Sequence, residues 1–223
     1  MEFHPPYLLF LGDARDQLAA KTANGVRVWR PEWCIVQFLL DGCEADCSVP
    51  DMSIEEAAAA GVKTVILGVV SRGGVIPPNW ISELIKALEL GMDIASGLHT
   101  RINLLPELVT GAIQYGRSLH DVRHPTREFD VGNGIKRSGK RLLTVGTDVS
   151  VGKMFTSLAV EAEMKNRGLA ADFRATGQTG ILIAGRGVSI DAVIADFISG
   201  AVEWLCPEND DDHWDLVEGQ GSL

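Results

Sequence analysis

Apolar and polar positions follow two different periods along the first half of the chain. Residues 62–70 form a nearly continuous apolar run rich in β-branched side chains, which is typical of a strand buried on both faces. Before this run, Ser53 and Glu56 form a capping box and Gly61 supplies a stop, so the sequence predicts a helix between them. After it, residues 80–90 have apolar side chains at helical spacing and predict an amphipathic helix that ends at Gly91.

Shorter segments continue this alternation. Residues 7–11 and 93–97 predict strands, residues 26–29 are a candidate for one more strand, and residues 108–115, after Pro106, predict a helix. Strands that alternate with helices predict an α/β fold with a parallel, doubly wound sheet. In such sheets ligands bind where strands end.

The second half of the chain repeats this order after a linker. Residues 121–140 contain several glycines and basic side chains with little periodicity, which is typical of a connection. Beyond them, strands are predicted at 142–145, 171–175 and 214–217, and helices at 155–166 and 191–205. We therefore expect two domains, residues 1–130 and residues 131–223.

Composition and charge narrow the class of protein. The chain has 223 residues, of which 46% are hydrophobic, and its net charge of −10 disfavours a nucleic-acid partner. No apolar run approaches the ~20 residues of a membrane span, and Met1–Pro6 lacks the features of a signal peptide. We expect a cytoplasmic homo-oligomer that acts on a small-molecule substrate, with no membrane or nucleic-acid partner.

Cysteine spacing predicts no metal site. Cys43 and Cys47 are close in sequence, but no second pair of ligands accompanies them. In a cytoplasmic protein the cysteines are expected to be reduced thiols.

The most informative segment is a glycine-rich loop between a predicted strand and a predicted helix. Residues 146–153 have the Gly-x-x-x-x-Gly-Lys pattern of a Walker A loop. Its glycines let main-chain N–H groups point inward beside the positive end of the helix, and its lysine adds a mobile cation. The loop therefore predicts a site for a phosphate-bearing ligand, formed by Gly146, Thr147, Val149, Ser150, Val151, Gly152, Lys153 and Met154.

One position departs from the Walker A pattern. Met154 stands where Ser or Thr normally binds the Mg²⁺ of a nucleotide, and a thioether is a poor ligand for a hard cation. Thr156 cannot replace it, because two residues turn a helix by roughly 200°. The sequence predicts a phosphate cradle without the usual metal ligand.

Glu218 follows the last predicted strand and occupies the position of a Walker B acid. There a carboxylate binds a metal or acts as a base. The chain stops five residues later, whereas a P-loop domain normally continues with more strands. We therefore expect a fragment whose P-loop domain is truncated at its C-terminus.

Two further turns follow predicted strands. Arg72, beside Gly73, could hold a carboxylate or phosphate by a bidentate fork, and a tight turn with a solvated arginine is an equally good interpretation. Gln178 and Thr179 lie in a second glycine-rich turn and are candidates to reach the ligand, with a simple connection as the alternative.

Taken together, these motifs resemble a known family. Gly146-Thr147-Asp148 and Val217-Glu218-Gly219 are similar to motifs of dethiobiotin synthetases. The closer resemblance, over essentially the whole chain, is to a bacterial D-glutamate N-acetyltransferase-like family whose members are longer. It rests on residues 7–13, 71–74, 96–99, 133–137, 146–148, 174–180 and 218–222.

The resemblance implies a Rossmann-like domain followed by a P-loop NTPase-like α/β domain. It also implies transfer of acetyl from acetyl-CoA to the amine of D-glutamate in D-amino-acid breakdown. In that reaction Glu218 or Asp148 would be the catalytic base, and N–H groups of residues 177–180 would stabilise the oxyanion. Arg72, Gly73, Gln178 and Thr179 would bind the substrate.

Two other functions fit the same residues. An enzyme similar to dethiobiotin synthetase would use ATP and Mg²⁺ to activate an amine or carboxylate, with Asp148 and Glu218 compensating for Met154. A non-catalytic nucleotide sensor would bind its ligand without turnover.

Overall fold

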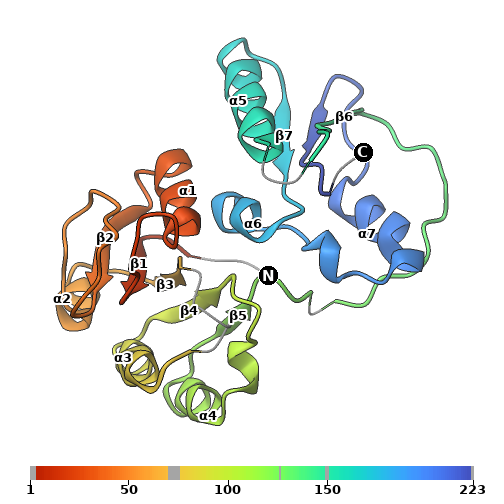
Figure 1. Cartoon of the computed structure of the whole chain (residues 1–223). Coiled ribbons are helices and arrows are strands. Elements are labelled where there is room, and N and C mark those ends of the chain that lie inside the picture. Colours follow the sequence, from red (N-terminus) through yellow and green to blue (C-terminus); the bar gives the residue numbers. More distant parts are fainter. Residues whose placement is uncertain (1–3, 70–75, 126, 149–150, 222–223) are drawn as a thin grey trace. The chain divides into compact units, whose positions relative to one another are not determined.

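The computed structural model describes residues 4–69, 76–125, 127–148 and 151–221. The chain divides into two compact units, Met1–Arg123 and His124–Leu223, and each is described by itself (Figure 1). Both units contain a parallel sheet with helices in the connections, which confirms the predicted α/β class.

The first unit is built on a parallel sheet. Within the described residues its strands follow the order β2-β1-β3-β4-β5. They are β1 (Tyr7–Gly12), β2 (Cys34–Leu39), β3 (Thr64–Leu67), β4 (Asp93–Ser96) and β5 (Leu119–Asp121). The chain reverses direction across the sheet between β1 and β3, which is where doubly wound sheets form their ligand crevice.

Helices connect these strands much as the periodicity predicts. They are α1 (Lys21–Trp29), α2 (Ile54–Ala59), α3 (Pro78–Glu89) and α4 (Pro106–Tyr115), with a short 3₁₀ turn, η2 (Ile102–Leu104). The capping box is confirmed, since Ser53 Oγ accepts the Glu56 N–H and the Glu56 carboxylate accepts the Ser53 N–H. Helix α3 buries Trp80, Leu84 and Leu88.

The strand considered for residues 26–29 is wrong, because these residues end helix α1. The helix continues through Asn24 and Gly25, whose types favour a turn. Its position depends on contact with the end of β3: the Ala23 N–H donates to the Gly68 carbonyl at 3.0 Å. A Cβ at Gly68 would overlap that of Ala23. A tertiary contact has overridden a local preference.

The second unit has a parallel sheet in the order β6-β8-β7 within the described residues. Its strands are β6 (Lys140–Leu143), β7 (Ala171–Arg174) and β8 (Trp214–Val217), and its helices are α5 (Lys153–Asn166), α6 (Gln178–Ala184) and α7 (Ile198–Leu205). Strand β8 lies between the other two and pairs Val217 with both Leu143 and Arg174. The strand before the Walker A loop is therefore next to the strand before Glu218.

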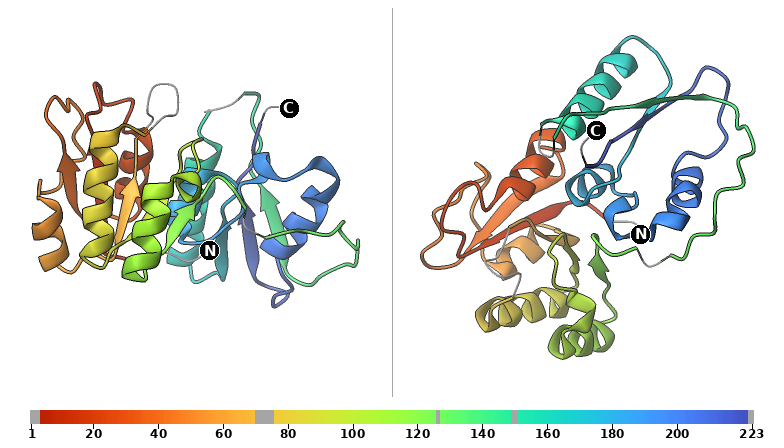
Figure 2. Two further views of the ribbon diagram at one scale, coloured as in Figure 1. Left: turned by 90° about the horizontal axis from the view of Figure 1, so that it is seen from below. Right: turned by 45° about the vertical axis from the view of Figure 1, so that its right-hand side comes forward.

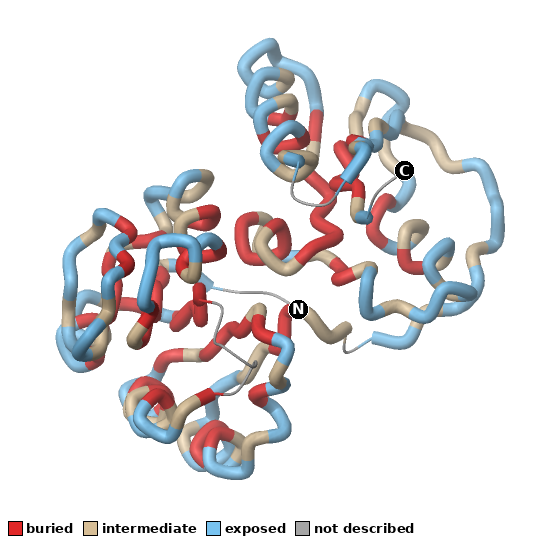
Figure 3. The backbone as a smooth tube through the Cα atoms, viewed as in Figure 1, coloured by how far each residue is buried: buried red, intermediate tan, exposed pale blue. Residues whose placement is uncertain are grey.

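Helices α5 and α7 lie on opposite sides of β7 and β8 (Figure 2). On the α7 side, Ala201 and Leu205 pack with Val188 and Val217. Burial is concentrated in β7, β8, α6 and the β7–α6 connection (Figure 3). The centre of this unit therefore lies where strand ends and helix α6 meet.

The helix predicted for residues 191–205 is partly wrong. The α-helix begins only at Ile198, after two 3₁₀ turns, η3 (Ile190–Ala192) and η4 (Ala195–Phe197). Val193 and Ile194 between the turns have extended backbone. Val193 packs against the core whereas Ile194 is exposed, so apolar spacing alone misidentified an irregular segment as a helix.

Candidate functional site

The Walker A loop connects the end of β6 to the start of α5. Gly152 precedes the helix with φ of +98°, in the left-handed region that glycine adopts most readily. A Cβ at Gly146 would lie 2.6 Å from Val151 Cγ2, so a larger residue there would force the Val151 side chain to move. Crowding at Gly146 and the left-handed backbone at Gly152 therefore favour glycine at both positions of the motif. Val149 and Ser150 lie outside the described residues.

Lys153 joins this loop to the segment after β8. Its ammonium donates hydrogen bonds to the main-chain oxygens of Asp148 and Gly221, both at 2.7 Å. Lys153 therefore holds the loop beside the segment that begins at Glu218. A Cβ at Gly219 would overlap the Thr144 carbonyl oxygen, which explains glycine at this close approach.

The buried hydroxyl groups of Thr144 and Ser157 contact each other next to the two ends of the Walker A loop. Thr144 Oγ1 lies 2.9 Å from Ser157 Oγ, 3.2 Å from the Lys153 carbonyl oxygen and 3.3 Å from the Gly219 nitrogen, which donates to it. Thr144 thus connects β6, α5 and the segment after β8. Neither hydroxyl was predicted from the sequence, because their partnership spans thirteen positions of the chain.

Met154 is half-buried at the second position of α5, and Thr156 is exposed. The buried hydroxyl of this helix is Ser157, which is engaged with Thr144. Among the residues that the structure describes, no group of three or more His, Cys, Asp or Glu side chains could hold a metal ion.

Glu218 is buried and faces the turn between β7 and α6. Its Oε2 accepts the N–H groups of Thr176 at 3.0 Å and Gly177 at 3.2 Å. Burial raises the pKa of this carboxyl; these N–H bonds oppose the rise, and the negative charge of Asp191 adds to it. A Cβ at Gly180 would lie 2.5 Å from Oε2, so that glycine makes room for the carboxylate.

The β7–α6 turn is held to the end of β8 by a second contact. The Thr176 hydroxyl donates to the Glu218 carbonyl at 2.6 Å and accepts from the Gln220 side chain at 3.0 Å. Gln178 and Thr179 are half-buried at the start of α6, directly after this turn. The Gly177 N–H, which we expected to donate to a substrate oxyanion, donates to Glu218 in this structure.

The structure says less about the other residues that the sequence predicted for the site. Arg72 and Gly73 lie outside the described residues. Asp148 is exposed in the Walker A loop, and its carbonyl is the Lys153 partner. In the first unit, Asp13 at the end of β1 accepts the Trp80 indole N–H at 3.0 Å.

Comparisons with known proteins identify the two units. Residues 130–223 match the model described as "Domain of unknown function (DUF1611_C) P-loop domain", and residues 39–125 match "Domain of unknown function (DUF1611_N) Rossmann-like domain". Two curated proteins named D-glutamate N-acetyltransferase are similar. The one from Tritonibacter scottomollicae is 58% identical over 98% of this chain and 66% of its own length. The one from a Pseudoalteromonas species is 51% identical over 100% of this chain and 67% of its own length.

A solved structure agrees with these matches. The crystal structure of a DUF1611 family protein from Anabaena variabilis has a TM-score of 0.82 and 32% identity, covering 99% of this chain and 67% of that protein. The chain belongs to the DUF1611 family. It spans about two thirds of the length of each of these relatives. The predicted Rossmann-like and P-loop domains are confirmed.

One motif of the resemblance to this DUF1611 family has a structural role here. The N–H groups of Asn133 and Gly134 both donate to the Glu203 carboxylate at 3.0 Å. Arg137 donates to the carbonyl oxygens of Glu203 and Cys206 at the C-terminal end of α7. Residues 133–137 of the DUF1611 chain therefore hold helix α7 in place, and these contacts do not involve the phosphate cradle.

The length and hydrophobicity of the helices in this DUF1611 chain bear on whether one of them could span a membrane. Within the described residues, every helix is too short or too polar to cross a bilayer.

Proposed function

We propose that this protein transfers acetyl from acetyl-CoA to the amine of D-glutamate. Two relatives, 58% and 51% identical, carry the name D-glutamate N-acetyltransferase. The observation that carries the proposal is the hydrogen bond from Lys153 to Gly221, because it holds the Walker A loop beside the segment that carries the buried Glu218 carboxylate, as a shared site would require. We further propose a role in D-amino-acid breakdown. The cytoplasmic location and homo-oligomeric assembly remain predictions.

The cradle suits a ligand that is bound by its phosphates. Coenzyme A has a pyrophosphate and a 3′-phosphate, and the main-chain N–H groups of residues 146–152, the N-terminal end of α5 and Lys153 would hold such a group. Met154 supplies no hard ligand for Mg²⁺. Binding without phosphate cleavage needs no such ligand, so this substitution fits acetyl transfer better than nucleotide hydrolysis.

Glu218 is the base that we favour. The attacking amine must lose a proton as its nitrogen bonds to the thioester carbon and the carbon–sulfur bond breaks, with the sulfur leaving as the thiolate of coenzyme A. Burial raises the pKa of Glu218, which makes its carboxylate a stronger base than an exposed glutamate. Asp148, exposed in the loop, is the second candidate.

The substrate would be bound by side chains around the strand ends. We propose Gln178 and Thr179, at the start of α6, and Arg72 with Gly73, after β3, for this role. Gln178 and Thr179 follow the turn whose N–H groups contact Glu218, so a substrate there would lie near the proposed base.

The proposal is tested by incubating the purified protein with acetyl-CoA and a panel of D- and L-amino acids. We expect thiol release that depends on D-glutamate, with N-acetyl-D-glutamate identified by mass spectrometry. Release of phosphate from ATP with Mg²⁺, dependent on an amino acid and independent of acetyl-CoA, would replace this proposal with the ATP-dependent alternative. Calorimetric binding of nucleotide without turnover would favour a sensor.

A further inference from the structure

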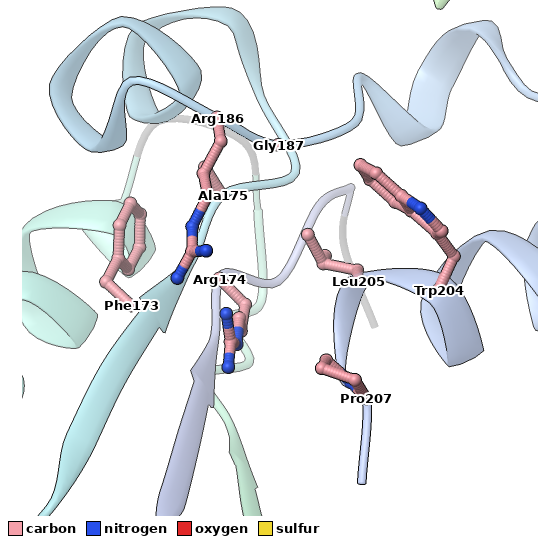
Figure 4. Close-up of a pocket in the computed structure, with 8 residues that line it drawn as sticks. All are labelled: Phe173, Arg174, Ala175, Arg186, Gly187, Trp204, Leu205 and Pro207. Carbon is pink, nitrogen blue, oxygen red and sulfur yellow. The ribbon is translucent and has the colours of Figure 1, made fainter. Parts of the chain in front are cut away.

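A pocket lies in the P-loop unit, beside the end of β7 and against α7 (Figure 4). Its volume is about 170 Å³, which is suited to a molecule of a few carbon atoms. Arg174, Ala175 and Arg186 line one side, and Trp204, Leu205 and Pro207 line the other. The Walker A residues do not line it, so this pocket is separate from the phosphate cradle.

The two arginines differ in how firmly they are held. Arg174 has a side chain only 7% exposed, and its Nε and Nη2 both lie 2.7 Å from Asp215 Oδ1. Arg186, from the turn after α6, has a side chain 63% exposed, and its Nη2 is 3.7 Å from Asp172 Oδ2. Arg174 is thus held by buried contacts, whereas Arg186 is largely exposed and its 3.7 Å ion pair with Asp172 is a weak one.

The charges around the arginines do not cancel. Asp172 and Asp215 are shared among Arg174, Arg186 and Arg141, whose Nε lies 3.7 Å from Asp215 Oδ2. Lys165, which is paired with Glu161, and His213 also approach these carboxylates. Three guanidinium groups against two carboxylates leave a positive excess, in a chain whose net charge is −10.

The opposite wall is largely apolar. The guanidinium of Arg127 lies 5.5 Å from the centre of the Trp204 ring, and Phe129 packs against the same ring at 5.8 Å. Leu205 belongs to the core cluster of this unit. A ligand in this pocket would therefore meet cations on one side and a largely apolar surface on the other.

We propose that this pocket binds a small carboxylate with a short aliphatic body, which Arg186 contacts directly and Arg174 supports. A guanidinium recognises a carboxylate by two parallel hydrogen bonds, and the aliphatic body would lie on Trp204, Leu205 and Pro207. The inference rests on the contacts of the pocket and not on acetyl transfer. Acidic amino acids belong to this ligand class, and D-glutamate is therefore one of the probes.

The test measures binding without acetyl-CoA. Titration with glutarate and with D-glutamate should release heat and change the fluorescence of Trp204, and Trp204→Phe should abolish the fluorescence change. Arg186→Gln should raise Kd at least tenfold. Arg167→Gln is the matched control, because Arg167 is an exposed arginine directly after α5 and does not line the pocket. The Kd of this variant should equal that of the unaltered protein.

A further variant tests whether Asp172 competes with the ligand for the two pocket arginines. Asp172→Asn removes a carboxylate that contacts both pocket arginines, so Kd should fall several-fold. The proposal is overturned if neither probe binds at millimolar concentration or if Arg186→Gln and Arg167→Gln have equal effects. It is also overturned if Lys153→Met abolishes binding while Arg186→Gln does not, because the probe would then occupy the phosphate cradle. Each outcome is independent of whether acetyl transfer occurs.

Discussion

Thr144 and Ser157 share a buried hydrogen bond of 2.9 Å beneath the Walker A loop. The two hydroxyls connect the strand that enters the loop to the helix that leaves it. Because Thr144 also receives the Gly219 N–H, the same pair positions the segment that carries Glu218.

Ser157→Ala tests this connection. Loss of one buried hydrogen bond should lower the free energy of unfolding by about 1 kcal/mol. It should also raise the KM for acetyl-CoA more than it lowers kcat, because the loop binds rather than reacts. Thr156→Ala, an exposed position on the same helix, is the control and should change neither quantity. Equal effects of the two substitutions would show that the pair has no special role.

Lys153→Met removes the ammonium and keeps an unbranched stem of four heavy atoms. Affinity for coenzyme A, measured by calorimetry, should fall at least tenfold, because the cation that faces the phosphates is lost. Arg167→Met, directly after the opposite end of the same helix, should keep the affinity unchanged. Undiminished binding by Lys153→Met would remove the phosphate cradle from the proposed function.

Glu218→Gln tests the proposed base. The turnover rate should fall by about 10²–10⁴-fold if this carboxylate accepts the proton of the amine. In the unaltered protein the rate should rise with pH through a pKa above the ordinary 4.5 of glutamate, because burial raises it. A variant that retains full turnover would transfer the role to another group, Asp148 first.

The same pKa shift makes a prediction about stability. A glutamate whose folded pKa is raised binds its proton more tightly in the folded state, so its contribution to stability declines as pH rises from about 4.5 through the raised pKa. Glu218→Gln should remove this decline. Thermal unfolding at pH 4.5 and pH 8 should show that the variant loses less stability over this interval than the unaltered protein. Parallel losses in both proteins would contradict the shift.

Gly219→Ala tests the close approach of two strand ends. A methyl group there would overlap the Thr144 carbonyl oxygen, and the rearrangement should cost about 1–3 kcal/mol of unfolding free energy. Gly111→Ala in helix α4 is the matched control. Its Cβ would lie 3.3 Å from the end of the Leu88 side chain and 3.9 Å from the Ile85 side chain. The Leu88 end can move aside and alanine favours the helix, so stability should stay the same or rise slightly. The denaturant midpoints of the two variants separate these outcomes.

Asp215→Ala tests the buried ion pair with Arg174. Both side chains are almost completely buried, so removing the carboxylate leaves the guanidinium with the more distant Asp172, 3.5 Å away, and should destabilise the fold by up to about 3–5 kcal/mol. Glu163→Ala, which removes the partner of exposed Arg167, should cost less than about 1 kcal/mol. Similar costs for the two variants, measured by chemical denaturation, would show that solvent screens the inner pair.

Local patterns in the sequence determined much of this protein. The capping box at Ser53, the helix of residues 80–90 and the Walker A loop were predicted because each depends on groups within a few positions of one another. The alternation of strands and helices predicted parallel sheets for the same reason: each element shows its own period.

The tertiary structure alone decided which groups meet. Glu218 reaches the Thr176 N–H across 42 positions, Arg174 reaches Asp215 across 41, and Lys153 reaches Gly221 across 68. Residues 26–29 lie in helix α1, which contacts the end of β3 through the Ala23 N–H. Periodicity and motif spacing describe neighbours along the chain, whereas burial and ion pairing depend on how strands order themselves within a sheet.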